Sequence, residues 1–194
     1  MRFFIALDID EAIRQRLAKF MDGVRGFAPD VRFVGSESFH VTLKFLGETE
    51  KLEGILQVLT PVSGSQFSVE FRGYGFFPGA KNPRVFWAGI NAGPELGALA
   101  QKIDEAVAPL GFEREKGPYH PHLTLARSGS GRPQRTRGDR VNSLFAHLQH
   151  KLSQLPEPEF GTMTAREFHL YESKLSPRGA AYTKLHSFPL GGTG

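Results

Sequence analysis

Apolar residues recur along the chain with two periods, and each period predicts one kind of element. Short apolar or alternating runs predict strands over 2–8, 31–34, 39–46, 67–77, 84–90, 122–127, 160–171 and 180–188. Apolar faces at helical spacing predict helices over 13–24, 52–59, 96–107 and 141–152. Because strands and helices do not alternate strictly, the order favours an α+β fold with mainly antiparallel pairing.

One segment stands apart from this pattern. Residues 128–139 consist of Gly, Pro and polar residues and predict a loop. The loop region carries Arg132, Arg135, Arg137 and Arg140, with no acidic residue before Asp139. Two interpretations stay open, a grip on an RNA backbone and a solvated surface loop.

Composition narrows the class of protein. The chain has 194 residues, is 40% hydrophobic and so supports a buried core. It has no Cys, which excludes disulfides, a thiolate nucleophile and Cys-ligated metal sites. A net charge of +4 suits a phosphate-bearing partner better than a cationic one.

Membrane and export signals are weak. Apolar runs such as 3–7 and 85–90 fall far below the roughly 18 residues of a membrane span. Asp8 interrupts the apolar start before a signal peptide can form. We therefore expect a cytoplasmic protein without a membrane partner.

A short pattern that occurs twice carries the candidate chemistry. It reads His40-Val41-Thr42-Leu43 in the first half of the chain and His122-Leu123-Thr124-Leu125 in the second. On a strand, His and Thr two residues apart share one face, while the aliphatic neighbours share the other. Two such strands can place two imidazoles opposite one another.

Two opposed imidazoles suit displacement at phosphorus. One ring takes a proton from an attacking water and the other gives a proton to the departing oxygen, since imidazole titrates near neutral pH. The two Thr hydroxyls can donate hydrogen bonds to non-bridging phosphate oxygens. This scheme requires no metal.

These repeats resemble the two HxTx motifs of the two-histidine phosphoesterase superfamily. The surrounding sequence resembles its bacterial and archaeal RNA 2′,3′-cyclic phosphodiesterase branch, also called 2′-5′ RNA ligase-like. The resemblance is carried, in order, by residues 2–7, 40–47, 83–89, 121–127 and 170–175, with Gly179 and Tyr182. It extends over nearly the whole chain.

The resemblance implies a fold and a reaction. The fold is bilobal α+β with pseudo-twofold symmetry, in which two mainly antiparallel sheets face a central cleft and helices cover the outer faces. Residues 1–194 would form one domain of two intertwined lobes. The reaction is hydrolysis of RNA 2′,3′-cyclic phosphate ends to 2′-phosphomonoesters without metal or cofactor, with weak 2′-5′ ligation as its reverse. We expect a monomer that acts on RNA or a nucleotide bearing this phosphate.

The resemblance also assigns roles to residues. His40 would be the proton donor to the leaving 3′ oxygen, His122 the proton acceptor from water, and Thr42 and Thr124 the phosphate holders. Arg127 matches an Arg expected near the phosphate. Strand alternation places it on the face opposite Thr124, so this role requires the strand to end or bulge before Arg127.

The same residues allow other interpretations. His120 stands where similar proteins commonly have a basic residue, and with His122 and His40 it could ligate zinc. The chain could instead be a non-catalytic module that binds RNA ends, or a two-histidine enzyme for another cyclic phosphate or a 2′-5′ linkage.

The remaining His and aromatic residues carry weaker predictions. The other His residues are expected on solvated faces: His147, His150, His169 and His186. Four aromatic residues could stack on a base, although a core position is favoured for each: Phe76, Phe77, Trp87 and Tyr119.

Overall fold

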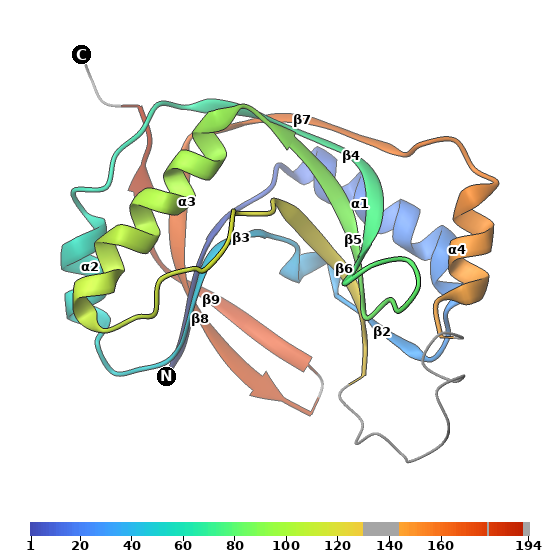
Figure 1. Cartoon of the computed structure of the whole chain (residues 1–194), viewed down its shortest axis with the longest axis horizontal. Helices are drawn as coiled ribbons and strands as arrows, with labels where there is room; N and C mark the ends of the chain where they lie inside the picture. Colours follow the sequence, from blue (N-terminus) through green and yellow to red (C-terminus); the bar gives the residue numbers. More distant parts are fainter. Residues whose placement is uncertain (130–143, 178, 192–194) are drawn as a thin grey trace.

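The computed structural model describes residues 1–129, 144–177 and 179–191, which form two antiparallel sheets (Figure 1). The first sheet has the order β3-β1-β8-β9, with β1 (Arg2–Leu7), β3 (Val41–Glu48), β8 (Glu167–Ser176) and β9 (Gly179–Pro189). The second has the order β2-β6-β5-β4-β7, with β2 (Val31–Phe33), β4 (Phe67–Phe77), β5 (Val85–Ala92), β6 (His122–Ser128) and β7 (Glu159–Ala165). The predicted α+β class with antiparallel sheets is confirmed.

Each sheet contains the same local arrangement around its motif strand. In the first sheet, β1 pairs with β3 after an intervening helix, α1 (Glu11–Val24). In the second sheet, β5 pairs with β6 after α3 (Pro94–Val107). The two halves of the chain therefore repeat a strand, helix and motif-strand unit, in agreement with the pseudo-twofold symmetry that the resemblance implied.

Helices α1 and α3 each pack against the sheet to which the strands of their own repeated unit do not belong. The ring of Phe20 on α1 packs 5.2 Å from Phe160 and 6.4 Å from Phe86, which are both in the second sheet. By contrast, α3 contacts β3 of the first sheet and α2 (Leu52–Leu59). Figure 1 shows α2 and α3 together at one end, and α1 with α4 (Ala146–Ser153) at the other. Each repeated unit thus contributes a helix that packs against the other sheet.

Apolar faces meet between these helices and the outer faces of the sheets. Leu17 of α1, Ile103 of α3 and Leu148 of α4 are fully buried there. The helical spacing of apolar residues therefore identified the core side of each helix. No helix among the described residues is long and apolar enough to cross a bilayer.

The predicted single strand over 160–171 was wrong. The chain forms β7 up to Ala165 and β8 from Glu167, and these strands belong to different sheets. β7 pairs with β4, whereas β8 lies between β1 and β9. Arg166 alone separates the two strands, so the alternation along the sequence carries no mark of the change of sheet.

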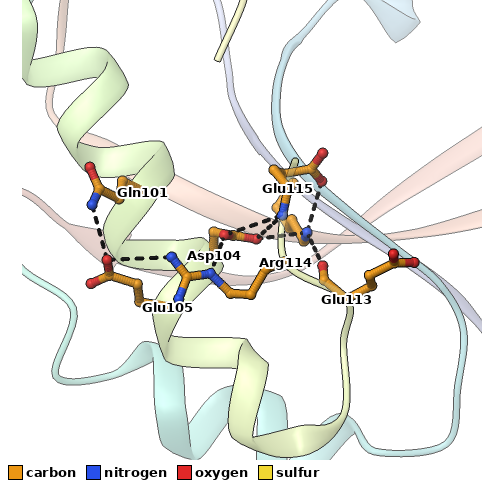
Figure 2. A network of polar contacts seen from close by, with 7 residues as sticks. Gln101, Asp104, Glu105, Glu113, Arg114 and Glu115 are labelled. Carbon is orange, nitrogen blue, oxygen red and sulfur yellow. Dashed lines mark hydrogen bonds and ion pairs between the residues drawn. The ribbon is translucent and has the colours of Figure 1, made fainter. Parts of the chain in front are cut away.

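A buried ion-pair network ties α3 to the first motif strand (Figure 2). Lys44 of β3 is 4% exposed, and its Nζ lies 2.8 Å from Asp104 Oδ1 on α3. The same ammonium donates to Glu115 Oε1 at 2.8 Å and to the Glu113 carbonyl at 2.7 Å. Arg114 Nε donates to the second Asp104 oxygen at 2.7 Å. Burial alone would lower the pKa of Lys44, but the hydrogen bonds that its ammonium donates to Asp104 and Glu115 outweigh burial and raise that pKa.

We expect Lys44→Ala to lower the free energy of unfolding by about 3 kcal/mol, because it leaves the buried Asp104 carboxylate with only the Arg114 guanidinium and the Glu115 backbone N–H as partners. Chemical denaturation at neutral pH measures the change. As a control, Lys116→Ala removes an exposed pair with Glu113 and should cost less than about 0.5 kcal/mol. Equal losses in the two variants would contradict a structural role for the network.

Candidate active site

A one-residue irregularity in β6 determines which side chains face the site. Between Thr124 and Ala126 the pairing with β5 shifts by one residue, at Leu125. Leu125 and Ala126 are consequently both buried, and Arg127 emerges exposed on the face of His122 and Thr124. The role expected for Arg127 requires a bulge before this residue, and β6 contains one.

The first motif strand has the same irregularity at the same place. Between Thr42 and Lys44 the pairing of β3 with β1 shifts by one residue, at Leu43. Leu43 and Lys44 are both buried, and Phe45 emerges 56% exposed. Phe45 therefore has the position in β3 that Arg127 has in β6.

Both motif imidazoles are oriented by a backbone carbonyl two residues earlier. His40 Nδ1 lies 2.7 Å from the Ser38 carbonyl, and His122 Nδ1 lies 2.9 Å from the His120 carbonyl. A ring that donates from Nδ1 carries its exchangeable proton site at Nε2. His40 Nε2 lies 3.0 Å from Thr42 Oγ1. Both rings thus present Nε2 for proton transfer.

The two motifs are linked directly. Tyr119, three residues before His122, donates its hydroxyl proton to the Thr42 carbonyl at 2.8 Å. Burial raises the pKa of Tyr119, so its hydroxyl stays a neutral donor. β3 and β6 also contact each other. The charge of Arg127 lowers the pKa of both His40 and His122, as expected if the guanidinium lies near both rings.

Aromatic side chains of the first sheet enclose His40. Its ring centroid lies 4.7 Å from that of Phe4, 5.2 Å from Tyr182 and 6.5 Å from Tyr171. This burial is the main reason that the pKa of His40 is lowered to about 4. Arg127 lowers that pKa further, whereas the Asp8 carboxylate opposes the shift.

Asp8 is a functional candidate that the sequence analysis missed. The Tyr171 hydroxyl and the Lys184 ammonium both donate to its carboxylate, and His169 Nε2 lies 3.5 Å from Oδ2. Burial would raise the pKa of Asp8, but the bonds from Lys184 and Tyr171 prevail and lower it. The available signal was a charged residue directly after the apolar run of β1.

The prediction that His169 lies on a solvated face was wrong. His169 is 2% exposed, and its Nδ1 lies 2.9 Å from Ser187 Oγ. It sits on the inner strand β8, where Asp8 and Ser187 supply polar partners that offset burial. His147, His150 and His186 are exposed, as predicted.

The second sheet surrounds His122 with different groups. Its ring meets that of Phe77 edge-on at 4.9 Å and lies 6.4 Å from Trp87. Burial lowers the pKa of His122, and the charges of Arg127 and His120 lower it further. The ring is therefore a neutral acceptor at pH 7.

The four aromatic residues that could stack on a base lie in different surroundings in the structure. Phe76 packs on Phe86 at 5.2 Å and on Phe145 at 5.6 Å in the core. Phe77 and Trp87 lie beside His122, and Tyr119 bonds the first motif. Phe76 and Tyr119 are half-buried and pack against the core, which is the position favoured for all four.

The zinc interpretation gains no support from the described residues, where no three His, Asp or Glu side chains gather as metal ligands. His120 and His122 accordingly have no third ligand there. The loop arginines Arg132, Arg135, Arg137 and Arg140 lie outside the described residues, as does Val141 of the predicted fourth helix.

We expect His40 to titrate near pH 4 and His122 below pH 6.5 in the free protein, because burial disfavours both imidazolium ions. NMR of the imidazole C–H protons measures both values, with His40→Ala to assign them. Asp8→Asn should lower the pKa of His40 further, since it removes the carboxylate that raises it. Asp22→Asn, an exposed control on α1, should change neither value. A wild-type His40 that titrates near pH 6.5 would contradict this account.

Comparison with known proteins gives a family match over most of the chain. The family model described as the 2′-5′ RNA ligase superfamily matches residues 10–175. A protein named RNA 2′,3′-cyclic phosphodiesterase from Archaeoglobus fulgidus is 37% identical over 193 residues, covering 97% of this chain and 99% of the relative. One of the same name from Methanothermobacter thermautotrophicus is 32% identical over 194 residues, covering 98% and 99%.

Solved structures agree with this match. A Thermus thermophilus protein superposes with a TM-score of 0.75 at 29% identity, covering 97% of each chain. Escherichia coli LigT complexed with 3′-AMP superposes with a TM-score of 0.75 at 25% identity, again over 97% of each chain.

Proposed function

The chain belongs to the 2′-5′ RNA ligase superfamily, and from this premise we propose that it hydrolyses RNA 2′,3′-cyclic phosphate ends to 2′-phosphomonoesters. Relatives of nearly the same length carry the name RNA 2′,3′-cyclic phosphodiesterase, which supports this enzyme activity. The observation that carries the proposal is the matched pair of imidazoles, each with Nδ1 held by a carbonyl and Nε2 left for proton transfer.

The proposed reaction is an in-line displacement. His122 Nε2 takes a proton from water as the water oxygen bonds to phosphorus. The bond from phosphorus to O3′ breaks, and His40 gives its Nε2 proton to O3′. The Thr42 and Thr124 hydroxyls and the Arg127 guanidinium hold the non-bridging oxygens and stabilise the charge that develops there. The balance requires water and no metal or cofactor.

The low pKa of His40 makes protonation part of substrate binding. A general acid must carry its proton, whereas burial and Arg127 disfavour the imidazolium in the free protein. A phosphate anion bound beside His40 and Arg127 offsets the guanidinium charge and favours the imidazolium. The Asp8 carboxylate also favours the His40 imidazolium, because its charge raises the pKa of that ring. We therefore place Asp8 as a positioning residue that supports the acid form of His40.

The aromatic residues around His40 suit the nucleoside of the RNA end. The ribose that carries O3′ must lie on the side of its proton donor, which is the first sheet. There Phe45 is 56% exposed and stacks on Phe4 with centroids 5.8 Å apart. Exposed aromatic faces bind unstacked bases. These contacts support an RNA or nucleotide substrate over a bare cyclic phosphate.

Two further statements belong to the proposal. With a 5′-hydroxyl in place of water as the attacking group, the same groups would catalyse weak 2′-5′ ligation, which is the reverse of cleaving a 2′-5′ linkage. A module that only binds RNA ends is less well supported, because binding alone does not call for two imidazoles that are each oriented by a backbone carbonyl. We also propose that the protein acts as a monomer.

We expect His40→Ala and His122→Ala each to lower turnover of a 2′,3′-cyclic phosphate RNA end by at least about 100-fold, since each removes one proton-transfer group. The assay contains a chelator and follows the 2′-phosphate product. His147→Ala, an exposed His on α4, is the matched control and should retain full activity. Unchanged turnover in either motif variant, or wild-type activity that chelation abolishes, would refute the mechanism.

The pH profile should be bell-shaped, with both limbs of kcat/KM below pH 6.5. Activity rises with pH as His122 loses its proton and falls as His40 loses its own, and burial lowers both free pKa values. In kcat the falling limb should move to higher pH, because bound phosphate favours the His40 imidazolium. Asp8→Asn should move that limb back down. Falling limbs that coincide in kcat and kcat/KM would argue against protonation coupled to binding.

A further inference from the structure

The cleft face of the first sheet consists of three rows of side chains that run across its strands. Directly opposite residues of an antiparallel sheet share a face, so the register identifies each row. The strand β1 supplies Ala6, Phe4 and Arg2, one to each row. Their partners on β3, β8 and β9 are, row by row, Thr42, His169 and Ser187, then Phe45, Tyr171 and Lys184, then Glu48, Ser173 and Tyr182.

The charge of Arg2 has no partner in the part of the chain that the structure describes. Arg2 is half-buried, and its Nε is buried without a hydrogen-bond acceptor there. Glu48 lies directly opposite on β3, yet the two side chains form no ion pair. Lys184, in the neighbouring row, already donates to the Asp8 carboxylate. The Arg2 guanidinium is therefore the cation of these rows that remains for an anionic ligand.

Tyr182 shows where the charge of Arg2 lies. Burial raises the pKa of Tyr182, whereas the charges of Arg127 and Arg2 both lower it. The Tyr182 ring lies 5.2 Å from that of His40. Arg127 also lowers the pKa of His40, but Arg2 is not among the charges that chiefly set that value. Both guanidinium groups are thus near Tyr182, and Arg127 is the nearer of the two to the imidazole.

The substrate of the proposed reaction brings a second phosphate to this face. The cyclic phosphate lies beside His40, and its nucleoside lies over the aromatic row of Phe4. The RNA chain leaves that nucleoside through O5′, across the ribose from the cyclic phosphate. In one direction along β1 it meets the Arg2 guanidinium. In the other direction β1 leads to Asp8, whose carboxylate repels phosphate.

We propose that Arg2 binds the phosphodiester on the 5′ side of the terminal nucleotide, an inference that deepens the proposed function and rests on it. A guanidinium suits this ligand, because its planar fork donates parallel hydrogen bonds to one phosphate group. The buried Nε gains the acceptor that it lacks in the free protein. Arg2 thus makes the enzyme prefer an RNA chain to a cyclic nucleotide with a free 5′-hydroxyl.

Three substrates with the same cyclic phosphate test this preference. They are adenosine 2′,3′-cyclic phosphate, its 5′-phosphorylated form, and the dinucleotide that carries a second adenosine through a phosphodiester at O5′. We expect wild-type kcat/KM to be about tenfold higher for the second and third than for the first, as one charge-assisted contact provides. This comparison needs no variant. The second substrate separates a phosphate contact from stacking of the added base.

Arg2→Met keeps an unbranched side chain and removes the charge, so it should bring the three kcat/KM values together. Lys174→Met is the matched control, because Lys174 follows Ser173 on β8, faces the other side of the sheet and pairs with Glu172. It should retain the wild-type preference. Salt gives a second readout. In the wild type, log kcat/KM should fall with log salt by about 0.7 more steeply for the second substrate than for the first, and Arg2→Met should remove this difference.

Titration calorimetry tests the site without turnover. The wild type should bind adenosine 2′,5′-bisphosphate about tenfold more tightly than adenosine 2′-phosphate, and Arg2→Met should bind both alike.

The outcomes separate this inference from the proposed function. Hydrolysis by the wild type without a preference for the 5′-phosphate, or a preference that survives in Arg2→Met, refutes the site and leaves the phosphodiesterase intact. A wild type that hydrolyses none of the three substrates refutes the proposed function. Tighter binding of the bisphosphate through Arg2 would then still support the phosphate site, whereas equal binding of the two adenosine phosphates would refute it.

Discussion

The irregularity that ends each HxT motif is the constraint on which the site depends. A regular strand would alternate strictly, so Arg127 would point to the core, away from Thr124. The shift at Leu125 buries two consecutive residues and returns the next one to the face of the motif. The equivalent shift at Leu43 buries Lys44, whose ammonium then requires the Asp104 network that fastens α3 to β3. One local feature thus shapes both the site and the packing behind it.

The repeated scaffold produces a site that is not symmetric in its chemistry. Equivalent positions after the two irregularities hold Phe45 on one side and Arg127 on the other. His40 therefore sits among aromatic rings with Asp8 as a supporting charge, whereas His122 faces Phe77 and an adjacent pocket. A chemical reaction with one acid and one base needs this difference, because two imidazoles in identical surroundings would carry the same charge.

Burial of both imidazoles disfavours the protonated form that a proton donor needs and favours the neutral form that a proton acceptor needs. Removal from water lowers the pKa of both rings, so at pH 7 the free protein holds both mainly in the neutral form. In the proposed mechanism, the neutral His122 can accept a proton before substrate arrives, whereas His40 acquires its proton only beside a bound anion. Such coupling would keep the complete acid and base pair for the occasions when a phosphate is bound.

Much of this protein is readable from its sequence, since the relevant physics is local. Helical spacing of apolar residues located the four helices and their buried faces, and His and Thr two residues apart share a strand face by backbone geometry alone. The duplicated motif therefore indicated the residues of the candidate site, and the family resemblance that it carries implied the repeated halves of the fold. The class of antiparallel α+β structure followed from the order of the elements.

Only the tertiary structure decided which strand pairs with which, and this pairing is not local. It divided 160–171 between two sheets, placed Arg127 on the face of the motif and buried His169 beside Asp8. It also opened a pocket where Trp87 lies over Gly75. Each of these depends on hydrogen bonds and contacts between strands far apart in the chain, so residue periodicity along any one strand does not record them.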